Sequence, residues 1–349
     1  MLGLFSCEGA AGSSSSSLSQ PWPGEMGGSI DLEQSATFAF DTLLYITTYH
    51  GETDVHDEII DTLQKLDSLF DPYNAPLSGV VSVYSLNNAG GRPLTVDPLL
   101  YEALQDALEA EEATGGLFDP LIGKVTALYK EAFYGEDHDP YLPDMDEVQT
   151  YLKEAEESSL VLGDNYSVQI VGDASIDLGG IAKGFALDKT IEILKSHGVC
   201  DFLIQLSGSS LGLGNNPDRM NEGGAFKVRI NTYVGDNDHI LSARFNGLST
   251  SATYEQQVMF GPDRYSHIIN PQTGSAVCPN DIGVVIGDIE SNAMLDAFST
   301  VVCLTPGDEL AALDESLREK GYDVRLFAMK DGKDVYLSDG FEISGVELP

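Results

Sequence analysis

The stretch Asp177–Asp188 constrains the fold more than any other part of the chain. It reads Asp-Leu-Gly-Gly-Ile-Ala-Lys-Gly-Phe-Ala-Leu-Asp and follows an alternating run at 167–171 that is typical of a strand. Leu187, Ile191 and Leu194 then recur at spacings of four and three residues, which indicates one face of a helix. The sequence therefore predicts a strand, a tight glycine-containing loop and the beginning of a helix.

This loop has the features of a phosphate-binding turn. Glycines let the backbone approach a ligand closely, and the free amide groups of a first helical turn attract anions. Lys183 stands beside those amides and would add a positive charge for phosphate oxygens. The same residues also suit a tight connection with a solvated lysine, so this stretch alone leaves both interpretations open.

The charge balance limits the partners of the chain. Its 349 residues contain 18 Lys and Arg against 56 Asp and Glu, which gives a formal net charge of −38. We expect no nucleic-acid partner, because no basic run exists that could neutralise phosphates. An anionic ligand would need local cations or a metal ion at its site, since the charge of the whole chain opposes it.

The amino-terminal residues differ in composition from the rest. Met1–Cys7 resembles the last part of a bacterial lipoprotein signal, in which a leucine three residues before a cysteine precedes lipidation. Residues 8–28 are rich in Ser, Gly and Pro, which is typical of a flexible tether. A ragged terminus with a chance cysteine is the alternative. We expect a truncated signal remnant and tether at 1–34, a folded domain at 35–349, and an extracytoplasmic protein that Cys7 anchors to the bacterial cell membrane.

The remaining sequence mixes strand and helix patterns. Residues 37–49 are rich in aromatic and β-branched side chains and predict strands, whereas Ile59, Leu63, Leu66 and Phe70 mark one face of a helix. Further helices are predicted at 98–113, 145–157 and 310–317, further strands at 202–206, 226–230, 243–245, 281–286, 324–329 and 335–337, and loops or turns at 114–120, 135–140 and 208–214. This order favours largely antiparallel sheets with packed helices.

Three side chains near the carboxyl end could carry chemistry. Asp296 and Thr300 lie four residues apart, so on a helix they share a face and can point to one place. Hard cations such as Mg²⁺ prefer a carboxylate and neutral oxygens of this kind. In the alternative interpretation, Thr300 returns a hydrogen bond to its own helix and Asp296 caps the helix or faces solvent. His267 could be a general base or a neutral core residue.

Five stretches, in this order, resemble the FAD:protein FMN transferase family, the ApbE family of bacterial flavinylation enzymes. They are Thr-Gly-Gly-Leu-Phe-Asp-Pro at 114–120, Asp-Leu-Gly-Gly-Ile-Ala-Lys-Gly at 177–184, Thr-Ser-Ala-Thr-Tyr at 250–254, His-Ile-Ile-Asn-Pro-Gln-Thr-Gly at 267–274 and Asp-Ala-Phe-Ser-Thr at 296–300. The resemblance implies an α+β fold of mixed, largely antiparallel sheets with packed helices, built as two intertwined halves around a cofactor cleft.

The resemblance also implies a reaction and its partners. FAD would bind with Mg²⁺, and its FMN half would be transferred to a threonine hydroxyl of an acceptor protein, such as a redox or electron-transfer subunit, with release of AMP. Attack on a pyrophosphate needs charge neutralisation and in-line positioning more than covalent participation by the enzyme. The oxygen-rich pair and the glycine-containing loop agree with this chemistry.

The same resemblance assigns roles to individual residues. Gly180 would complete, through its backbone oxygen, a metal site with Asp296 and Thr300. His267 would activate the acceptor hydroxyl as a general base, and Asp188 is expected to be structural. The residues expected to contact the flavin nucleotide are Phe40, Tyr73, Leu117, Phe118, Asp119, Asp177, Lys183 and Ile269.

Three positions depart from the family pattern. Phe40-Asp-Thr stands where the family usually has Met-Gly-Thr, Ala252 replaces a glycine, and Asn270 replaces an aspartate. These departures support a second hypothesis, a non-catalytic FAD-binding lipoprotein that serves as a cofactor reservoir or assembly subunit. A third is an FAD pyrophosphatase that gives FMN and AMP with water as the acceptor.

Overall fold

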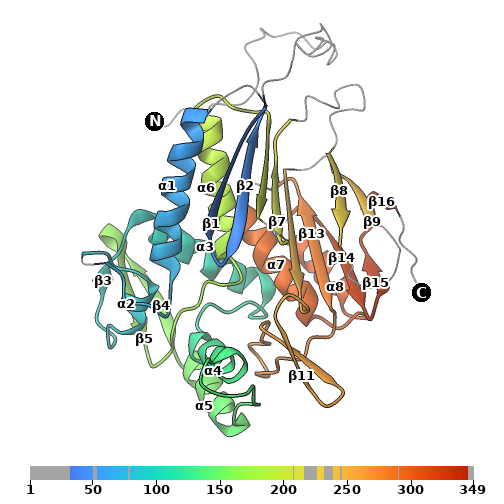
Figure 1. The fold of residues 1–349 in the computed structure, drawn as a ribbon. Helices are drawn as coiled ribbons and strands as arrows, with labels where there is room; N and C mark the ends of the chain where they lie inside the picture. Colours follow the sequence, from blue (N-terminus) through green and yellow to red (C-terminus); the bar gives the residue numbers. More distant parts are fainter. Residues whose placement is uncertain are drawn as a thin grey trace, which may run out of the picture.

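The computed structural model describes most of the chain after the first 31 residues. The described ranges are 32–49, 53–77, 79–206, 208–215, 226–231, 239–243, 246–289 and 291–344. Cys7 and nearly all of the predicted tether therefore lie outside the described residues. Within these ranges the chain combines antiparallel sheets with packed helices (Figure 1), which confirms the α+β class.

An eight-stranded sheet forms the centre of the molecule, and all of its neighbouring strands are antiparallel. Its strands, in spatial order, are β1 (Glu33–Ala39), β2 (Thr42–Thr48), β6 (Phe202–Leu206), β7 (Ser210–Leu213), β10 (Gly247–Ala252), β13 (Ile282–Gly287), β14 (Val324–Lys330) and β15 (Lys333–Leu337). Strands from the beginning and the end of the chain thus share one sheet, so residues far apart in sequence can meet along its edge.

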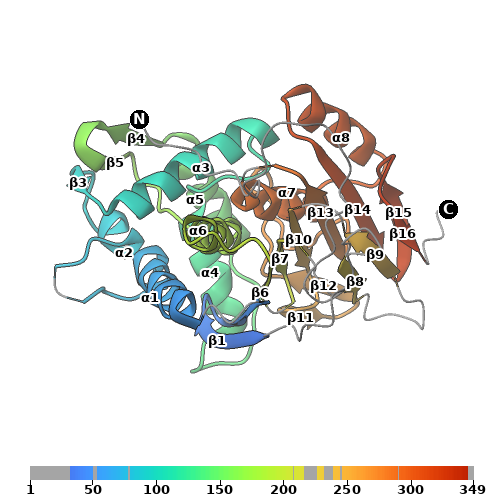
Figure 2. The same ribbon diagram turned by 90° about the horizontal axis from the view of Figure 1, so that it is seen from above.

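One face of this sheet is covered by helices. Figure 2 shows α1 (Thr53–Phe70), α6 (Ala182–Ser196) and α7 (Asn292–Leu304) on that side, with α3 (Pro98–Thr114) and α8 (Leu310–Glu319) further out. The predicted face of α1 is buried, since solvent reaches almost none of Ile59, Leu63 and Leu66. Helix α7 is almost entirely buried, so it forms the middle of the core.

The opposite face is covered over only part of its width. A three-stranded sheet of β8 (Phe226–Ile230), β9 (His239–Ala243) and β16 (Ile343–Ser344) packs there. Leu241 of this sheet shares a buried cluster with Leu248, Val284 and Phe327 of the large sheet. The structure therefore becomes a sandwich at its carboxyl-terminal side.

Several smaller helices and strands complete the fold around the large sheet. They are α2 (Val83–Asn87), β3 (Leu94–Thr95), α4 (Gly123–Tyr134), α5 (Met145–Glu156), β4 (Ser159–Gly163), a short 3-10 turn (Asp164–Tyr166), β5 (Ser167–Val171) and the hairpin of β11 (Gln257–Phe260) and β12 (Asp263–Ser266). Among the described residues, no helix combines the length and the apolar character that crossing a membrane requires.

One predicted turn is wrong. Residues 208–214 were expected to form a glycine-rich turn, but Ser210–Leu213 is strand β7 inside the large sheet. Gly212 is there because a Cβ atom at this position would lie 2.6 Å from Leu187 and 3.0 Å from Ile191 of α6. The glycine thus permits close packing of helix on sheet. The strand predicted at 243–245 overlaps β9 only at Ala243, because β9 spans His239–Ala243. Residues 244–245 fall outside the described residues.

Candidate active site

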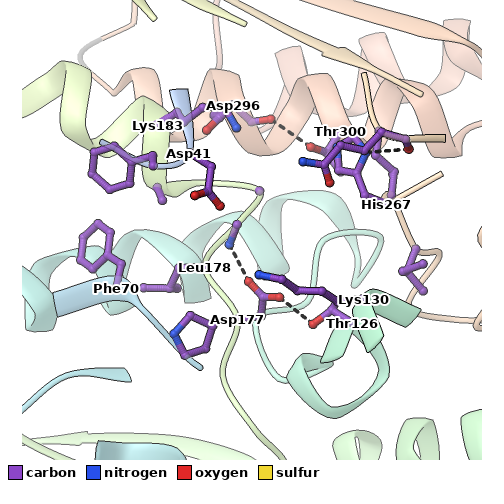
Figure 3. Close-up of a pocket in the computed structure, with 18 of the residues that line it drawn as sticks. Asp41, Phe70, Thr126, Lys130, Asp177, Leu178, Lys183, His267, Asp296 and Thr300 are labelled. Carbon is purple, nitrogen blue, oxygen red and sulfur yellow. Dashed lines mark hydrogen bonds between the residues drawn. The ribbon is translucent and has the colours of Figure 1, made fainter. Parts of the chain in front are cut away.

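A single open cleft gathers all the predicted site residues. It has a volume of about 1020 Å³ and lies between the sheet edge, the start of α6 and helix α4 (Figure 3). The residues predicted for metal, flavin and proton transfer all line it: Gly180, Asp296, Thr300, Phe40, Tyr73, Leu117, Phe118, Asp119, Asp177, Lys183, Ile269 and His267. The five sequence motifs therefore converge on one place.

Asp296 is held rigidly on α7. The residue is only 2% exposed. Its two carboxylate oxygens accept hydrogen bonds from Ser249 Oγ at 3.0 Å and from the Gly184 amide at 3.0 Å. Asp188 supports this arrangement from α6, because its carboxylate accepts from the backbone amides of Asn292 and Ala293 in the first turn of α7. Asp188 is thus structural, as expected, and its burial raises its pKa to about 6.

Thr300 and Gly180 lie beside this carboxylate. Thr300 is one turn after Asp296 and shares its helix face (Figure 3). A Cβ atom at Gly180 would lie 3.6 Å from Thr300 Oγ1 and 3.2 Å from the Phe118 ring, so the glycine backbone approaches both closely. In the described part of the chain, no three His, Cys, Asp or Glu side chains cluster as a metal site. A cation here would have one carboxylate and neutral oxygens as ligands, which suits Mg²⁺.

A chain of hydroxyl groups connects Asp296 with Thr300. Ser249 Oγ lies 3.4 Å from Ser299 Oγ, which lies 2.7 Å from Ser251 Oγ, which in turn lies 3.1 Å from Thr300 Oγ1. Ser249 and Ser251 stand two residues apart on β10 and face α7. Ser251 and Ser299 lie in two of the sequence motifs, but their role depends on how β10 packs against α7, which the pattern did not predict.

Asp177 organises the loop before α6. One of its oxygens accepts from the Gly179 amide at 2.7 Å, and the other accepts from Thr126 Oγ1 at 2.6 Å (Figure 3). Lys183 follows in the first turn of α6 and forms no ion pair with any residue whose position is described. The loop therefore presents a free ammonium group to the cleft beside a fixed carboxylate.

Helix α4 supplies five cleft residues that the sequence analysis missed, Thr126 and Lys130 among them. Thr126 bonds Asp177, and Lys130 Nζ lies 3.8 Å from the centre of the Tyr73 ring. Burial, together with the charge of Asp177, raises the pKa of Tyr73, so this phenol stays neutral. Val125 and Tyr129 stand four residues apart and are buried, and this spacing is the signal that could have revealed the helix.

Phe40 and Asp41 form the tight turn between β1 and β2. Both have positive φ angles, 53° and 56°, as the two central residues of a type I′ hairpin turn require. A phenylalanine adopts this conformation rarely, so surrounding contacts must hold it there. The Asp67 carboxylate accepts from the Phe40 amide at 2.8 Å, and the Phe40 ring lies 6.2 Å from that of Phe70. The turn thus fixes an aromatic ring at the cleft.

His267 lies on the far wall of the cleft, opposite the α6 loop. Its Nδ1 is 3.4 Å from the Gln256 carbonyl oxygen, and solvent reaches the ring from the open side. The surrounding protein atoms, together with the charge of Lys183, lower the pKa of His267 to about 4. Solvent on the open side opposes this shift, but its direction favours a neutral imidazole at neutral pH, which is the form that can accept a proton.

The apolar side chains of Leu117, Phe118 and Ile269 form one wall of the cleft, with Asp119 beside them. Leu117 and Phe118 follow α3, and Thr114 Oγ1 accepts from the Phe118 amide at 3.0 Å, which orders this loop. Asp119 accepts from the Leu121 amide, and its burial raises its pKa. Ile269 is buried beside His267. These side chains suit a flat ring system better than a charged group.

Comparison with known proteins agrees with this geometry. The ApbE family model matches residues 40–325. The chain belongs to the ApbE family. It is 30% identical over 200 residues to an FAD:protein FMN transferase of Treponema pallidum, a match that covers 53% of this chain and 54% of that protein. A protein of the same name from Rhodobacter capsulatus is 26% identical over 279 residues, with 78% and 51% covered. The chain thus spans about half the length of these relatives.

Solved structures of the ApbE family share the fold. The ApbE protein of Thermotoga maritima superposes with a TM-score of 0.73 at 22% identity and covers 91% of this chain and 97% of its own. The flavin transferase ApbE of Vibrio cholerae gives 0.72 at 19% identity, with 89% and 98% covered. These values confirm the predicted architecture.

Two departures from the ApbE pattern have a structural explanation. Asn270 Oδ1 accepts from the backbone amides of Gln272 and Thr273 at 2.9 and 3.1 Å. An aspartate would accept the same two bonds, so the turn keeps its shape. Ala252 is 2% exposed at the end of β10 and pairs with Ile282. The hydrogen bonds that hold the Asp296 carboxylate come from Ser249 Oγ and the Gly184 amide, and therefore from neither replaced position.

Proposed function

We propose that this chain is an FAD:protein FMN transferase, which uses Mg²⁺ to transfer the FMN moiety of FAD to a threonine hydroxyl of an acceptor protein and releases AMP. The observation that carries the proposal is the convergence of all five motifs on one cleft of about 1020 Å³. The names of the curated relatives support the same activity.

The charges that line the cleft explain why a cation is needed. Two lysines line it, Lys130 and Lys183. They face seven carboxylates, from Asp41, Asp67, Asp71, Asp119, Asp177, Glu255 and Asp296. An anionic pyrophosphate would be repelled by this set unless a divalent cation bound with it. Asp296, Thr300 and the Gly180 carbonyl would hold Mg²⁺, which would neutralise charge on the pyrophosphate when bound.

The residues of the chain divide the reaction between them. Lys183 and the amides at the start of α6 bind phosphate oxygens, and the Phe40 turn with the 117–119 loop holds the flavin side of the substrate. The acceptor threonine oxygen forms a bond to the phosphorus of the FMN half while the pyrophosphate bond to the AMP half breaks. His267 takes the proton of the hydroxyl. The electron pair of the broken bond leaves with AMP.

An assay of acceptor mass tests this function. Purified chain is mixed with FAD, Mg²⁺ and a folded domain that bears a flavinylation-type threonine, with and without chelator. We expect the acceptor to gain the mass of one FMN only when metal is present. AMP release without any mass gain would favour the pyrophosphatase, and bound FAD with neither product would favour the reservoir.

Asp296→Asn provides the matched variant. The amide oxygen can still accept from Gly184, and the amide nitrogen can donate to Ser249 Oγ, so the fold is retained while the charge is lost. We expect the transfer rate to fall by about 100- to 1000-fold, as for the loss of one charge-stabilising group. Unchanged transfer in this variant would refute the metal site.

We also infer that Cys7 is lipidated and that the domain works outside the cytoplasm, because Met1–Cys7 resembles the last part of a bacterial lipoprotein signal. Labelling cells with a radioactive fatty acid tests this: incorporation into the chain and its loss in Cys7→Ser would support the anchor. A chain recovered unlabelled in the cytoplasmic fraction would contradict it.

A further inference from the structure

Strand β1 exposes apolar side chains at the edge of the sheet. Along β1, the polar residues Ser35 and Thr37 are half-buried on the side of α1, whereas Ala36 and Phe38 are exposed on the other side together with the polar Gln34. Antiparallel strands with one solvated face normally place polar residues outside. The outward face of β1 therefore exposes apolar side chains where solvent would favour polar ones.

Strand β2 extends the same surface. Phe38 pairs directly with Leu43, and Ala36 pairs with Tyr45, so all four side chains lie on one face. Phe38 is 62% exposed, Leu43 44% and Tyr45 43%. We call Ala36, Phe38, Leu43 and Tyr45 the hairpin face. Single exposed apolar residues are common, but a contiguous group of large ones marks an interaction site.

The hairpin face is also uncharged in a strongly acidic chain. Between Gln34 and Tyr49 only Asp41 carries a charge, although the chain as a whole contains 56 acidic residues. The three-stranded sheet covers this side of the large sheet at β10, β13 and β14 and does not bury the hairpin face. Within the described ranges, β1 has β2 as its single neighbour and forms the outer edge of the sheet (Figure 2).

The hairpin face continues directly into the cleft. Phe40 and Asp41, the turn of the same hairpin, line the cleft, as does Thr42. Phe38 and Leu43 are the first cross-strand pair on this face behind that turn. A protein that extends a threonine-bearing segment into the cleft would therefore lie against these side chains.

We propose that the hairpin face is the docking surface for the folded acceptor protein, which places its threonine segment over the Phe40 turn. This inference rests on the proposed transferase function and identifies where its protein substrate binds. Its apolar side chains would be buried by a complementary apolar patch on the acceptor, and the free edge of β1 offers backbone groups to an extended segment. A second copy fits poorly, because two chains of net charge −38 repel each other.

The test compares a folded acceptor with a short peptide that carries the same threonine segment. Phe38→Ser and Tyr45→Ser should each raise the KM for the folded domain about tenfold or more, as truncation of an aromatic anchor does at interfaces. The KM for the peptide, the rate at saturating acceptor and the affinity for FAD should stay unchanged, since neither side chain lines the cleft. Val161→Ser, at a 45% exposed position on β4, is the matched control and should change the KM less than about twofold.

A binding measurement separates this inference from the proposed function. Calorimetry of the His267→Ala variant with FAD and the same acceptor domain should show binding, and adding Phe38→Ser should weaken it about tenfold or more, whether or not the wild-type chain releases AMP. Absence of binding, or binding that Phe38→Ser leaves intact, would overturn the docking surface. Light scattering gives the last outcome: a dimer of the wild-type chain that Phe38→Ser converts to a monomer would assign the face to a second copy instead.

Discussion

Replacement of Gly184 by alanine should disturb the site from within the core. Gly184 lies in the first turn of α6, where that helix crosses the beginning of α7. A Cβ atom there would lie 2.2 Å from the Asn292 carbonyl oxygen and 2.7 Å from Ala293 Cα. Ordinary contact begins at 3.4 Å, so the helices would have to separate by about 1.2 Å. Backbone atoms cannot rotate away as a side chain can, so the clash is not relieved locally.

The energetic consequence follows from two losses. Overpacking of a core contact costs about 1–3 kcal/mol. The same movement weakens the bond from the Gly184 amide to the buried Asp296 carboxylate, and a hydrogen bond to a charged group contributes about 1.5–3 kcal/mol. We therefore expect Gly184→Ala to lower the free energy of unfolding by about 2.5–6 kcal/mol. This is a large part of the roughly 5–15 kcal/mol of a typical domain.

Urea denaturation followed by circular dichroism measures this change. Gly163→Ala is the control, because its added Cβ atom would meet only ordinary contacts, the nearest at 3.6 Å. The surviving folded fraction of Gly184→Ala should also transfer FMN more slowly, since Asp296 loses a fixed bond. A free energy of unfolding within about 1 kcal/mol of the wild type would show that the helices separate freely and would refute this reasoning.

Two further predictions concern the cleft. Because the pKa of His267 is lowered from 6.5 to about 4, transfer should stay level as the pH falls through 6.5 and decline only near 4. Between these values the unfolded chain binds a proton there that the folded chain does not, so acid also lowers the free energy of unfolding. Circular dichroism at each pH separates the effects, and a decline centred at 6.5 with the fold intact would contradict the shift. Lys130→Met should lower the free energy of unfolding by about 0.5–1 kcal/mol, because the cation–π contact with the Tyr73 ring is lost; urea denaturation that shows no change would exclude this contribution.

The periodic and motif-rich parts of the fold could be predicted from the sequence. Leu187, Ile191 and Leu194 are buried on α6, as their spacing requires. The resemblance to the ApbE family implied a cofactor cleft, and residues of all five motifs line one cleft. These predictions succeeded because local periodicity and glycine positions report on backbone shape directly.

The parts that failed depend on contacts between distant elements. Strand β7 was predicted as a turn because glycine is rare in strands. Only the close approach of Leu187 explains why a glycine stands at position 212. The hydroxyl chain behind Asp296 requires the register of β10 against β13 and the rotation of α7. No local pattern gives either quantity, so the sequence shows Ser251 as part of a motif but assigns it no role. Helix α4 is a different case, because the four-residue spacing of its buried residues Val125 and Tyr129 is visible in the sequence.

The hydroxyl chain between Asp296 and Thr300 has a fixed direction at its Asp296 end. A carboxylate accepts hydrogen bonds, so Ser249 directs its single hydrogen at Asp296 Oδ1 and can only accept from its other neighbours. Ser299 can donate to Ser249 or to the Asp296 carbonyl, whereas in the pairs that Ser251 forms with Ser299 and Thr300 either oxygen can be the donor. Thr300 can give its hydrogen to the Asp296 carbonyl oxygen at 3.4 Å. In that arrangement the lone pairs of Thr300 are free for the cleft, where this hydroxyl meets a ligand as an electron-pair donor.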